Sequence, residues 1–137
     1  MMRVLDYEIP DKLYYSKEHE WVRVQDKSAV VGITDYAQKQ LHEIVYVELP
    51  KKGSTIKQSE TLSTVESVKS VSDVFSPVSG KITEVNTELA ESPELLNQDP
   101  YGRGWIAIIE YSDLKKEMDK LLTPAQYAEH IKKLLHK

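Results

Sequence analysis

One hairpin-like segment of the chain reads Thr61-Leu62-Ser63-Thr64-Val65-Glu66-Ser67-Val68-Lys69-Ser70-Val71-Ser72-Asp73-Val74-Phe75. Two runs rich in β-branched residues flank a polar tip, which predicts strands over 61–65 and 71–75. Lys69 falls near the tip and is expected to project into water. A protonated lysine in water catalyses nothing by itself, but its amine can serve as an attachment point. Considered alone, a lysine in a turn is more often only a solvated charge.

Further strand signals surround this hairpin on both sides. They are the pair 20–24 and 29–33 around the turn Asp26-Lys27-Ser28, the run 44–49 stopped by Pro50, and the runs 81–85 and 105–109. Trp21 and Trp105 are expected to be core aromatic residues. Short strands with frequent turns predict a mainly β fold, a small barrel or sandwich.

Helix signals are few and lie mostly at the end of the chain. Thr34 is expected to cap a short helix that ends near Leu41, with Asp35 in its first turn. Two C-terminal helices are predicted. Asp113 is expected to cap the first, which has apolar residues at helical spacing: Leu114, Met118, Leu121 and Leu122. Thr123-Pro124 is expected to start the second, whose apolar stripe consists of Tyr127, Ile131, Leu134 and Leu135. We expect one domain over 1–137, with a β core at 12–112 and a helical addition at 113–137.

Composition narrows the possible functions. The chain has 137 residues and a formal net charge of −4, which argues against a nucleic-acid partner because phosphates require a cationic surface. No cysteine is present, and the four histidines lack zinc-site spacing, so neither thiol chemistry nor a metal site is expected. No apolar run is typical of a secretory signal or a membrane span. A cytoplasmic protein is expected, or a mitochondrial one if a transit peptide has been removed.

The segment Glu66-Ser67-Val68-Lys69 resembles the lipoylation motif of the glycine cleavage H proteins. Other blocks resemble that family in the same order along roughly residues 12 to 135: His19-Glu20-Trp21, Gly32-Ile33-Thr34-Asp35-Tyr36-Ala37, Val47-Glu48-Leu49-Pro50, Pro77-Val78-Ser79-Gly80, and Leu96-Asn97-Gln98-Asp99-Pro100-Tyr101-Gly102. His42, Ser59 and Arg103 depart from the family pattern, since the family more often has glycine at the first two positions and an acidic residue at the third.

The resemblance implies a barrel-sandwich hybrid, the lipoyl-domain fold, and a carrier without catalytic residues of its own. Lipoate would be attached covalently to Lys69 as N6-lipoyllysine by a lipoylating enzyme. The arm would take an aminomethyl group from the P protein, glycine decarboxylase, and deliver it to the tetrahydrofolate-dependent T protein, an aminomethyltransferase. The L protein, dihydrolipoamide dehydrogenase, would then reoxidise the arm.

Two carboxylates have alternative interpretations. Glu66 is either a recognition point for the lipoylating enzyme or a solvated charge beside a turn. Glu20 either pairs with the ammonium of an aminomethylated arm folded back on the protein, or is an ordinary surface carboxylate.

Other functional classes fit the sequence less well. An H-like carrier could instead serve lipoyl relay to other complexes or sulfur-compound oxidation. A biotin carrier normally has methionine on both sides of its lysine, whereas Lys69 has Val68 and Ser70. An enzyme is not indicated, because neither a nucleophile–base pair nor a phosphate-binding loop is visible.

Overall fold

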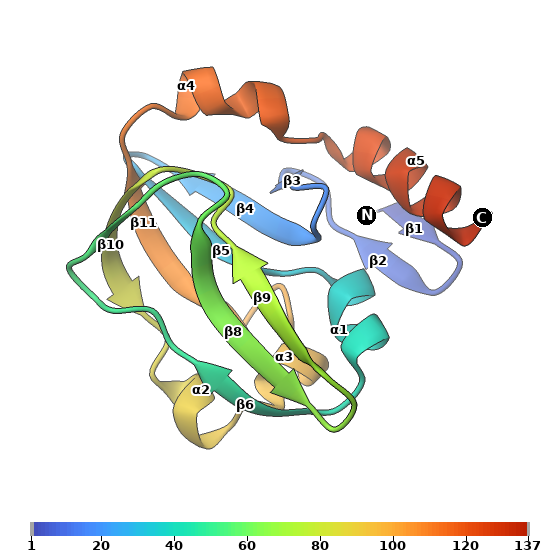
Figure 1. The fold of residues 1–137 in the computed structure, drawn as a ribbon. Helices are drawn as coiled ribbons and strands as arrows, with labels where there is room; N and C mark the ends of the chain where they lie inside the picture. The colour runs from blue at the N-terminus through green and yellow to red at the C-terminus, as the bar shows by residue number, and fades with distance from the viewer. Residues whose placement is uncertain (1, 137) are drawn as a thin grey trace.

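Two antiparallel sheets face each other in the computed structural model, which describes residues 2–136 (Figure 1). The six-stranded sheet has the order β3 (Tyr14–Tyr15), β4 (Glu20–Gln25), β5 (Ser28–Ile33), β11 (Ala107–Tyr111), β10 (Gly80–Val85) and β7 (Thr55–Ile56). The three-stranded sheet has the order β6 (Ile44–Glu48), β8 (Thr61–Ser67) and β9 (Val71–Phe75).

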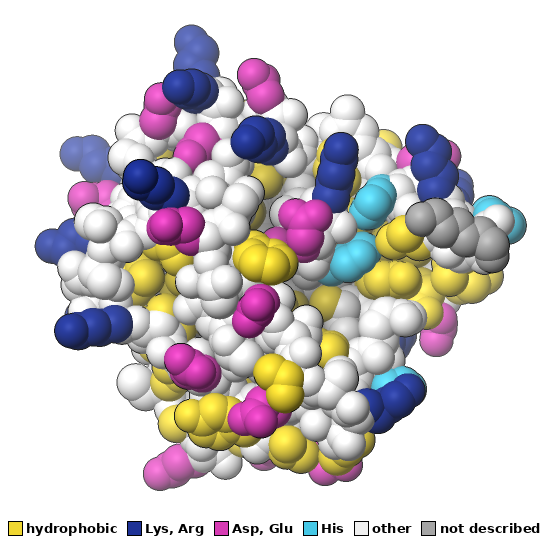
Figure 2. Space-filling model, viewed as in Figure 1, with side chains coloured by type: hydrophobic (Ala, Val, Ile, Leu, Met, Phe, Trp, Pro, Cys, Tyr) yellow, Lys and Arg dark blue, Asp and Glu magenta, His cyan; other side chains and the backbone are white. Residues whose placement is uncertain are grey.

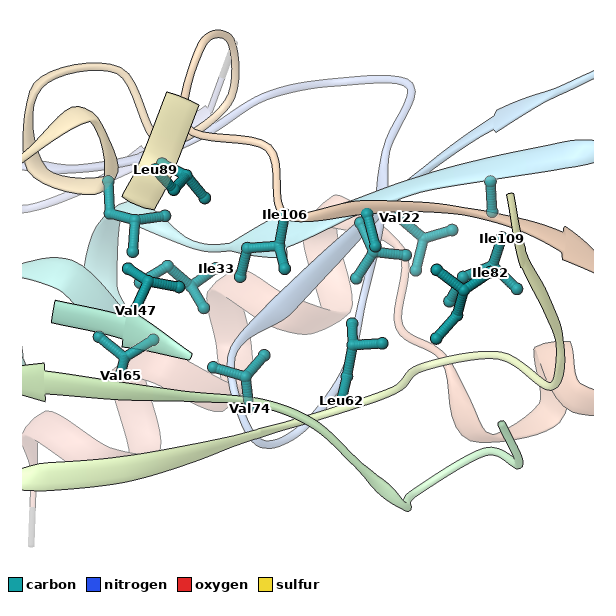
Figure 3. Packing of buried hydrophobic residues seen from close by; sticks show 14 of the residues in the cluster. Val22, Ile33, Val47, Leu62, Val65, Val74, Ile82, Leu89, Ile106 and Ile109 are labelled. Atoms are coloured by element: carbon teal, nitrogen blue, oxygen red, sulfur yellow. The ribbon is translucent and has the colours of Figure 1, made fainter. Parts of the chain in front are cut away.

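The main hydrophobic core fills the space between these sheets (Figure 3). Val22 and Ile109 contribute to it from the six-stranded sheet, and Val47, Val65 and Val74 contribute from the three-stranded sheet. Each of the five is at most 3 % exposed. Because burial of one aliphatic side chain contributes about 1.5–3 kcal/mol, this shared core holds the two sheets together. The predicted mainly β sandwich is confirmed.

Most predicted strands lie where the sequence pattern placed them, with one clear exception. The predicted strand 105–109 begins too early, since β11 starts at Ala107. Trp105 instead closes a turn, with its amide donating to Gly102 O at 3.2 Å and its carbonyl accepting from Asn86 Nδ2 at 2.7 Å. Trp21 is fully buried as expected, whereas Trp105 is only partly buried.

The expected short helix is present as α1 (Asp35–Leu41). Thr34 caps it, because its Oγ1 accepts a hydrogen bond from the amide of Ala37 at 3.2 Å. The helix ends at His42, whose φ of 67° and ψ of −152° lie in a region that only glycine adopts without strain. Ser59 also has a positive φ, 75°. Both positions are those where the H-protein pattern more often has glycine.

The C-terminal region differs in part from the prediction. A single turn, α4 (Leu114–Glu117), runs into the 3-10 turn η1 (Met118–Lys120), and the side chain of Asp113 makes no capping hydrogen bond. Leu122 lies beyond these turns in an isolated bridge to Tyr15. The predicted longer helix is therefore wrong. The second helix is confirmed as α5 (Pro124–Leu135), with the full capping box between Thr123 and Gln126.

Six short elements were not predicted, among them the two-residue strands β3 and β7. Strands β1 (Met2–Val4) and β2 (Tyr7–Ile9) form a hairpin, and α2 (Glu88–Glu91) and α3 (Leu95–Gln98) are single helical turns. The hairpin and α5 lie beside β3, at one end of the six-stranded sheet, and enclose with it a second buried cluster, centred on Tyr15, Trp21, Tyr127 and Ile131 (Figure 1). None of the helices within residues 2–136 is long and apolar enough to cross a membrane.

His42→Gly is expected to stabilise the fold, because it relieves a backbone conformation that costs on the order of 1–3 kcal/mol for a non-glycine residue. The gain is reduced by about 0.5–1 kcal/mol for the greater entropy of glycine in the unfolded chain. Urea denaturation should show a net increase in the free energy of unfolding. Glu43→Gly, at the next exposed position and without a positive φ, should lower it. Equal effects of the two changes would contradict the strain at His42.

Helix α5 is expected to contribute strongly to stability through its buried face. Ile131 is fully buried against the second cluster, whereas Leu135 is 38 % exposed. Ile131→Ala should lower the free energy of unfolding by about 2–5 kcal/mol, and Leu135→Ala should change it by about 0.5 kcal/mol or less. Truncation after Asp113 should likewise lower the melting temperature. An unchanged melting curve would show that α5 is not docked.

Candidate carrier-arm attachment site

Lys69 lies at the exposed tip of the β8–β9 hairpin, as the sequence predicted. Hydrogen bonds fix the backbone of this tip. The amide of Ser67 donates to Ser70 O at 2.8 Å, and Ser67 Oγ accepts from the amides of Lys69 and Ser70, both at 3.1 Å. The amide of Val68 donates to Glu43 O at 3.0 Å, which ties the tip to the segment after α1. The amine of Lys69 is therefore presented from a rigid turn.

Glu66 lies on β8 directly beside the tip. Its cross-strand neighbours are Tyr46 on β6 and Val71 on β9. Its side chain is half-buried, and within residues 2–136 its carboxylate has neither a hydrogen bond nor an ion pair. A free carboxylate next to Lys69 is compatible with both interpretations of this residue.

Glu20 is not the surface carboxylate that one interpretation supposed. It is 2 % exposed at the start of β4. Its carboxylate accepts hydrogen bonds from the hydroxyl of Ser16 and from the amide of Phe75 on β9, the latter at 3.2 Å. Burial raises the pKa of Glu20 to about 7, although these hydrogen bonds act in the opposite direction. Glu20 is thus a buried acid that titrates near neutral pH.

A cleft of about 450 Å3 opens beside Glu20. The loop at 16–20 forms one wall, Phe75 and Pro77 another, and the segment at 119–122 completes it. Phe75 ends the same strand that begins at Val71 beside the tip. They are four steps apart along the extended chain, about 13 Å at 3.3 Å per residue. The structure therefore does not bring Glu20 into contact with Lys69, but β9 connects their two locations.

Comparison with known proteins gives a consistent result. The family model described as Glycine cleavage H-protein matches residues 13–134. The chain belongs to this family. A probable glycine cleavage system H protein of Pyrococcus abyssi is 52 % identical over 135 residues, covering 98 % of this chain and all of the relative. The glycine cleavage system H protein of Coprothermobacter proteolyticus is 57 % identical over 120 residues, 87 % of this chain and 94 % of the relative.

A solved structure supports the same conclusion. The glycine cleavage system H protein from Mycobacterium marinum superimposes with a TM-score of 0.79 at 36 % identity, covering 88 % of this chain and 97 % of that one. The predicted resemblance and the predicted H-protein fold are both confirmed. As a family member, the chain is a lipoyl carrier component of the glycine cleavage system.

In this family member, helix α5 holds the loop that carries Glu20. The hydroxyl of Tyr127 lies 2.8 Å from His19 Nδ1 and 2.7 Å from Thr34 Oγ1. His130 Nε2 lies 3.0 Å from the carbonyl oxygen of Lys17. Burial, with a smaller contribution from His130, lowers the pKa of His19 to about 4. His19 is therefore neutral near pH 7, which suits its place between aromatic rings.

Sequence reasoning missed most of the residues around Glu20. Ser16 and Phe75 carry no motif, and they are 59 residues apart along the chain while both bond the same carboxylate. Tyr127 was predicted only as part of an apolar stripe, although its hydroxyl bonds two side chains. The only available signal was the placement of Glu20 between His19 and Trp21 within a family-like block.

The raised pKa of Glu20 predicts that stability falls as the pH rises. Below about pH 4.5 the carboxyl is protonated in both states. Between pH 4.5 and 7 the unfolded chain loses the proton first, so the folded state is disfavoured, and the full cost persists above pH 7. Between pH 5 and 8, the wild type should lose about 2–3 kcal/mol relative to Glu20→Gln. Urea denaturation at both pH values measures this, and parallel changes in the two proteins would contradict it.

Proposed function

We propose that this chain carries a lipoyl group in amide linkage on Lys69 Nζ and passes an aminomethyl group between the enzymes of the glycine cleavage system. Lys69 would hold the group, which would supply a disulfide able to accept the aminomethyl group from the P protein, pass it to the T protein and be re-formed by the L protein. The protein supplies the attachment point, the path of the arm and a place for its end to rest. The chain acts as one domain over 1–137.

The position of Lys69 is the observation that carries this proposal. Its amine is exposed, so a lipoylating enzyme can reach it, and its backbone is fixed by the Ser67 bonds, so the arm starts from a constant place. Glu66 is proposed as a contact for that enzyme, because it lies on the strand leading into the tip and its carboxylate has no ion pair within residues 2–136. Val68 and Ser70 flank the lysine, unlike the methionines of a biotin carrier.

Lys69→Arg should abolish lipoylation while leaving the fold intact, since arginine keeps the charge but cannot form the stable amide. Intact mass after expression with a lipoylating enzyme measures the modification. Lys52→Arg, in another exposed turn, serves as the matched control and should gain the lipoyl mass normally. Lipoylation and carrier activity of the Lys69→Arg protein would show that the assignment is wrong.

Glu20 is proposed as the resting contact for the end of the loaded arm. The arm has about eleven bonds between the Cα of Lys69 and the dithiolane ring, and at about 1.5 Å per bond its reach matches the length of β9. The loaded arm ends in an ammonium group, which favours the ionised form of a neighbouring carboxyl. A carboxylate in a sheltered cleft could contribute about 1.5–3 kcal/mol through a charge-assisted hydrogen bond.

Glu20→Gln should therefore accelerate spontaneous loss of the aminomethyl group several-fold at pH 8, where wild-type Glu20 is ionised. At pH 5.5 the difference should shrink, because the wild-type carboxyl is then mostly protonated. The decay of the loaded protein is followed by mass spectrometry. Glu110→Gln, an exposed carboxylate on β11, should leave decay unchanged. Equal decay of wild type and Glu20→Gln at pH 8 would remove Glu20 from the arm site.

A further inference from the structure

Exposed apolar side chains gather around Lys69. Seven large hydrophobic residues are strongly exposed within residues 2–136, and four of them lie on the three-stranded sheet or at its tip. Their exposed fractions are 50 % for Val45, 51 % for Tyr46, 62 % for Val68 and 63 % for Val71. Scattered exposed apolar residues are ordinary, but a group of them on one surface indicates an interaction site.

The strand register places two of these four side chains, Tyr46 and Val71, on the outer face of the sheet. Tyr46 on β6 pairs with Glu66 on β8, which pairs with Val71 on β9. Directly paired residues point to the same side, so these three form one row across all three strands, next to the tip. The inward positions of the same strands already supply the main core. Tyr46 and Val71 therefore contribute nothing to that core, and their exposure is not explained by folding.

Carboxylates share this face with the apolar group. In the next row, Glu48 pairs with Thr64, and Thr64 pairs with Asp73. Glu43 lies beside the tip, where its carbonyl oxygen accepts from the amide of Val68. Figure 2 shows acidic and apolar side chains interspersed over the lower half of the molecule, where β8 and β9 run in Figure 1.

The charges on this face are one-sided. Within segments 43–48 and 61–75, four residues are acidic and Lys69 is the only basic one. None of the four carboxylates, counting Glu66, takes part in an ion pair within residues 2–136. Amide formation on Lys69 would remove the single cation. The lipoylated carrier would then present four carboxylates and an apolar group around the base of its arm.

We propose that this outer face, which we call the tip face (Tyr46, Glu48, Glu66, Val71 and Asp73, beside Lys69), is the docking surface for the glycine-decarboxylating enzyme, which takes the arm with its dithiolane closed. Its active-site entrance would carry an apolar pocket for Tyr46 and Val71, surrounded by lysine and arginine side chains. The proposal rests on the lipoylation of Lys69 proposed above. The complementarity distinguishes the lipoylated from the unmodified carrier, because amide formation on Lys69 makes the face more negative and so more attractive to a basic surface.

The short reach of the arm and the negative charge of the tip face exclude other binding partners for this face. An arm of about eleven bonds keeps the dithiolane close to the tip, and a standard interface covers about 800 Å2 per partner. An enzyme that takes the arm must therefore rest on the surface around Lys69. A second copy of this chain would oppose four carboxylates with four more, and a nucleic acid or an anionic membrane would also be repelled.

The first test uses the lipoylated protein as substrate for the glycine-decarboxylating enzyme of the system. Tyr46→Ser combined with Val71→Ser should raise the KM for the carrier about tenfold or more while kcat stays within about twofold, since exposed aromatic anchors dominate interface energetics. Leu5→Ser combined with Val24→Ser, which removes two exposed apolar side chains elsewhere, is the matched control and should leave KM unchanged. Equal KM values for both double variants and the wild type would overturn the proposal.

The second test concerns the charges. Glu48→Gln combined with Asp73→Asn should raise KM and flatten its dependence on salt, because fewer charges are screened. Glu84→Gln combined with Glu110→Gln changes the same charge elsewhere and should do neither. Intact mass is measured first. If the wild-type protein does not gain the lipoyl mass after expression with a lipoylating enzyme, the proposed function is refuted. Normal KM but slower lipoylation of the tip-face variants would instead assign this face to the lipoylating enzyme and overturn the proposal.

Discussion

The alternation of side chains along β8 and β9 is the constraint on which the other features depend. Val65 and Val74 point inward and join the core against the six-stranded sheet, so these strands cannot slide. A shift by one residue would turn every inward side chain to the outer face. The same alternation leaves Glu66 and Val71 on the outside beside the tip. Core packing on one side of the sheet therefore fixes what a partner meets on the other.

Glu20 shows how the site and the fold make conflicting demands. A carboxyl that is 2 % exposed and has a pKa of about 7 destabilises the folded state wherever it is ionised. Within residues 2–136, the hydroxyl of Ser16 and the amide of Phe75 are the only hydrogen-bond donors to its carboxylate that compensate for the lost hydration. If an ammonium group binds beside it, the proton on Glu20 and the bound arm compete, and each weakens the other by the same factor. The cleft is then a site whose occupancy depends on pH near neutrality.

The sequence predicted features that are determined locally and missed those that depend on distant contacts. The strand 71–75 and the helix cap at Thr123 were placed correctly, because alternation and cap chemistry reside in consecutive residues. The β1–β2 hairpin escaped prediction, since its strands have three residues each and its turn places Leu5 at positive φ without a glycine. Lys69 was predicted as the attachment point only through the family resemblance, because the local sequence by itself predicts no more than a solvated lysine in a turn. The burial of Glu20 depends on a strand 55 residues away.

The support of the Glu20 loop by α5 has a consequence for the order of assembly on the ribosome. The chain emerges from its N-terminus, so the β8–β9 hairpin, whose ladder is local, leaves well before Tyr127 and His130. Those two side chains hold the loop through His19 and the carbonyl of Lys17. The lysine-bearing turn can form during synthesis, whereas the wall of the cleft acquires its hydrogen bonds only when the last helix is released. The proposed attachment point and the proposed resting place of the arm are thus completed at different times during synthesis of the chain.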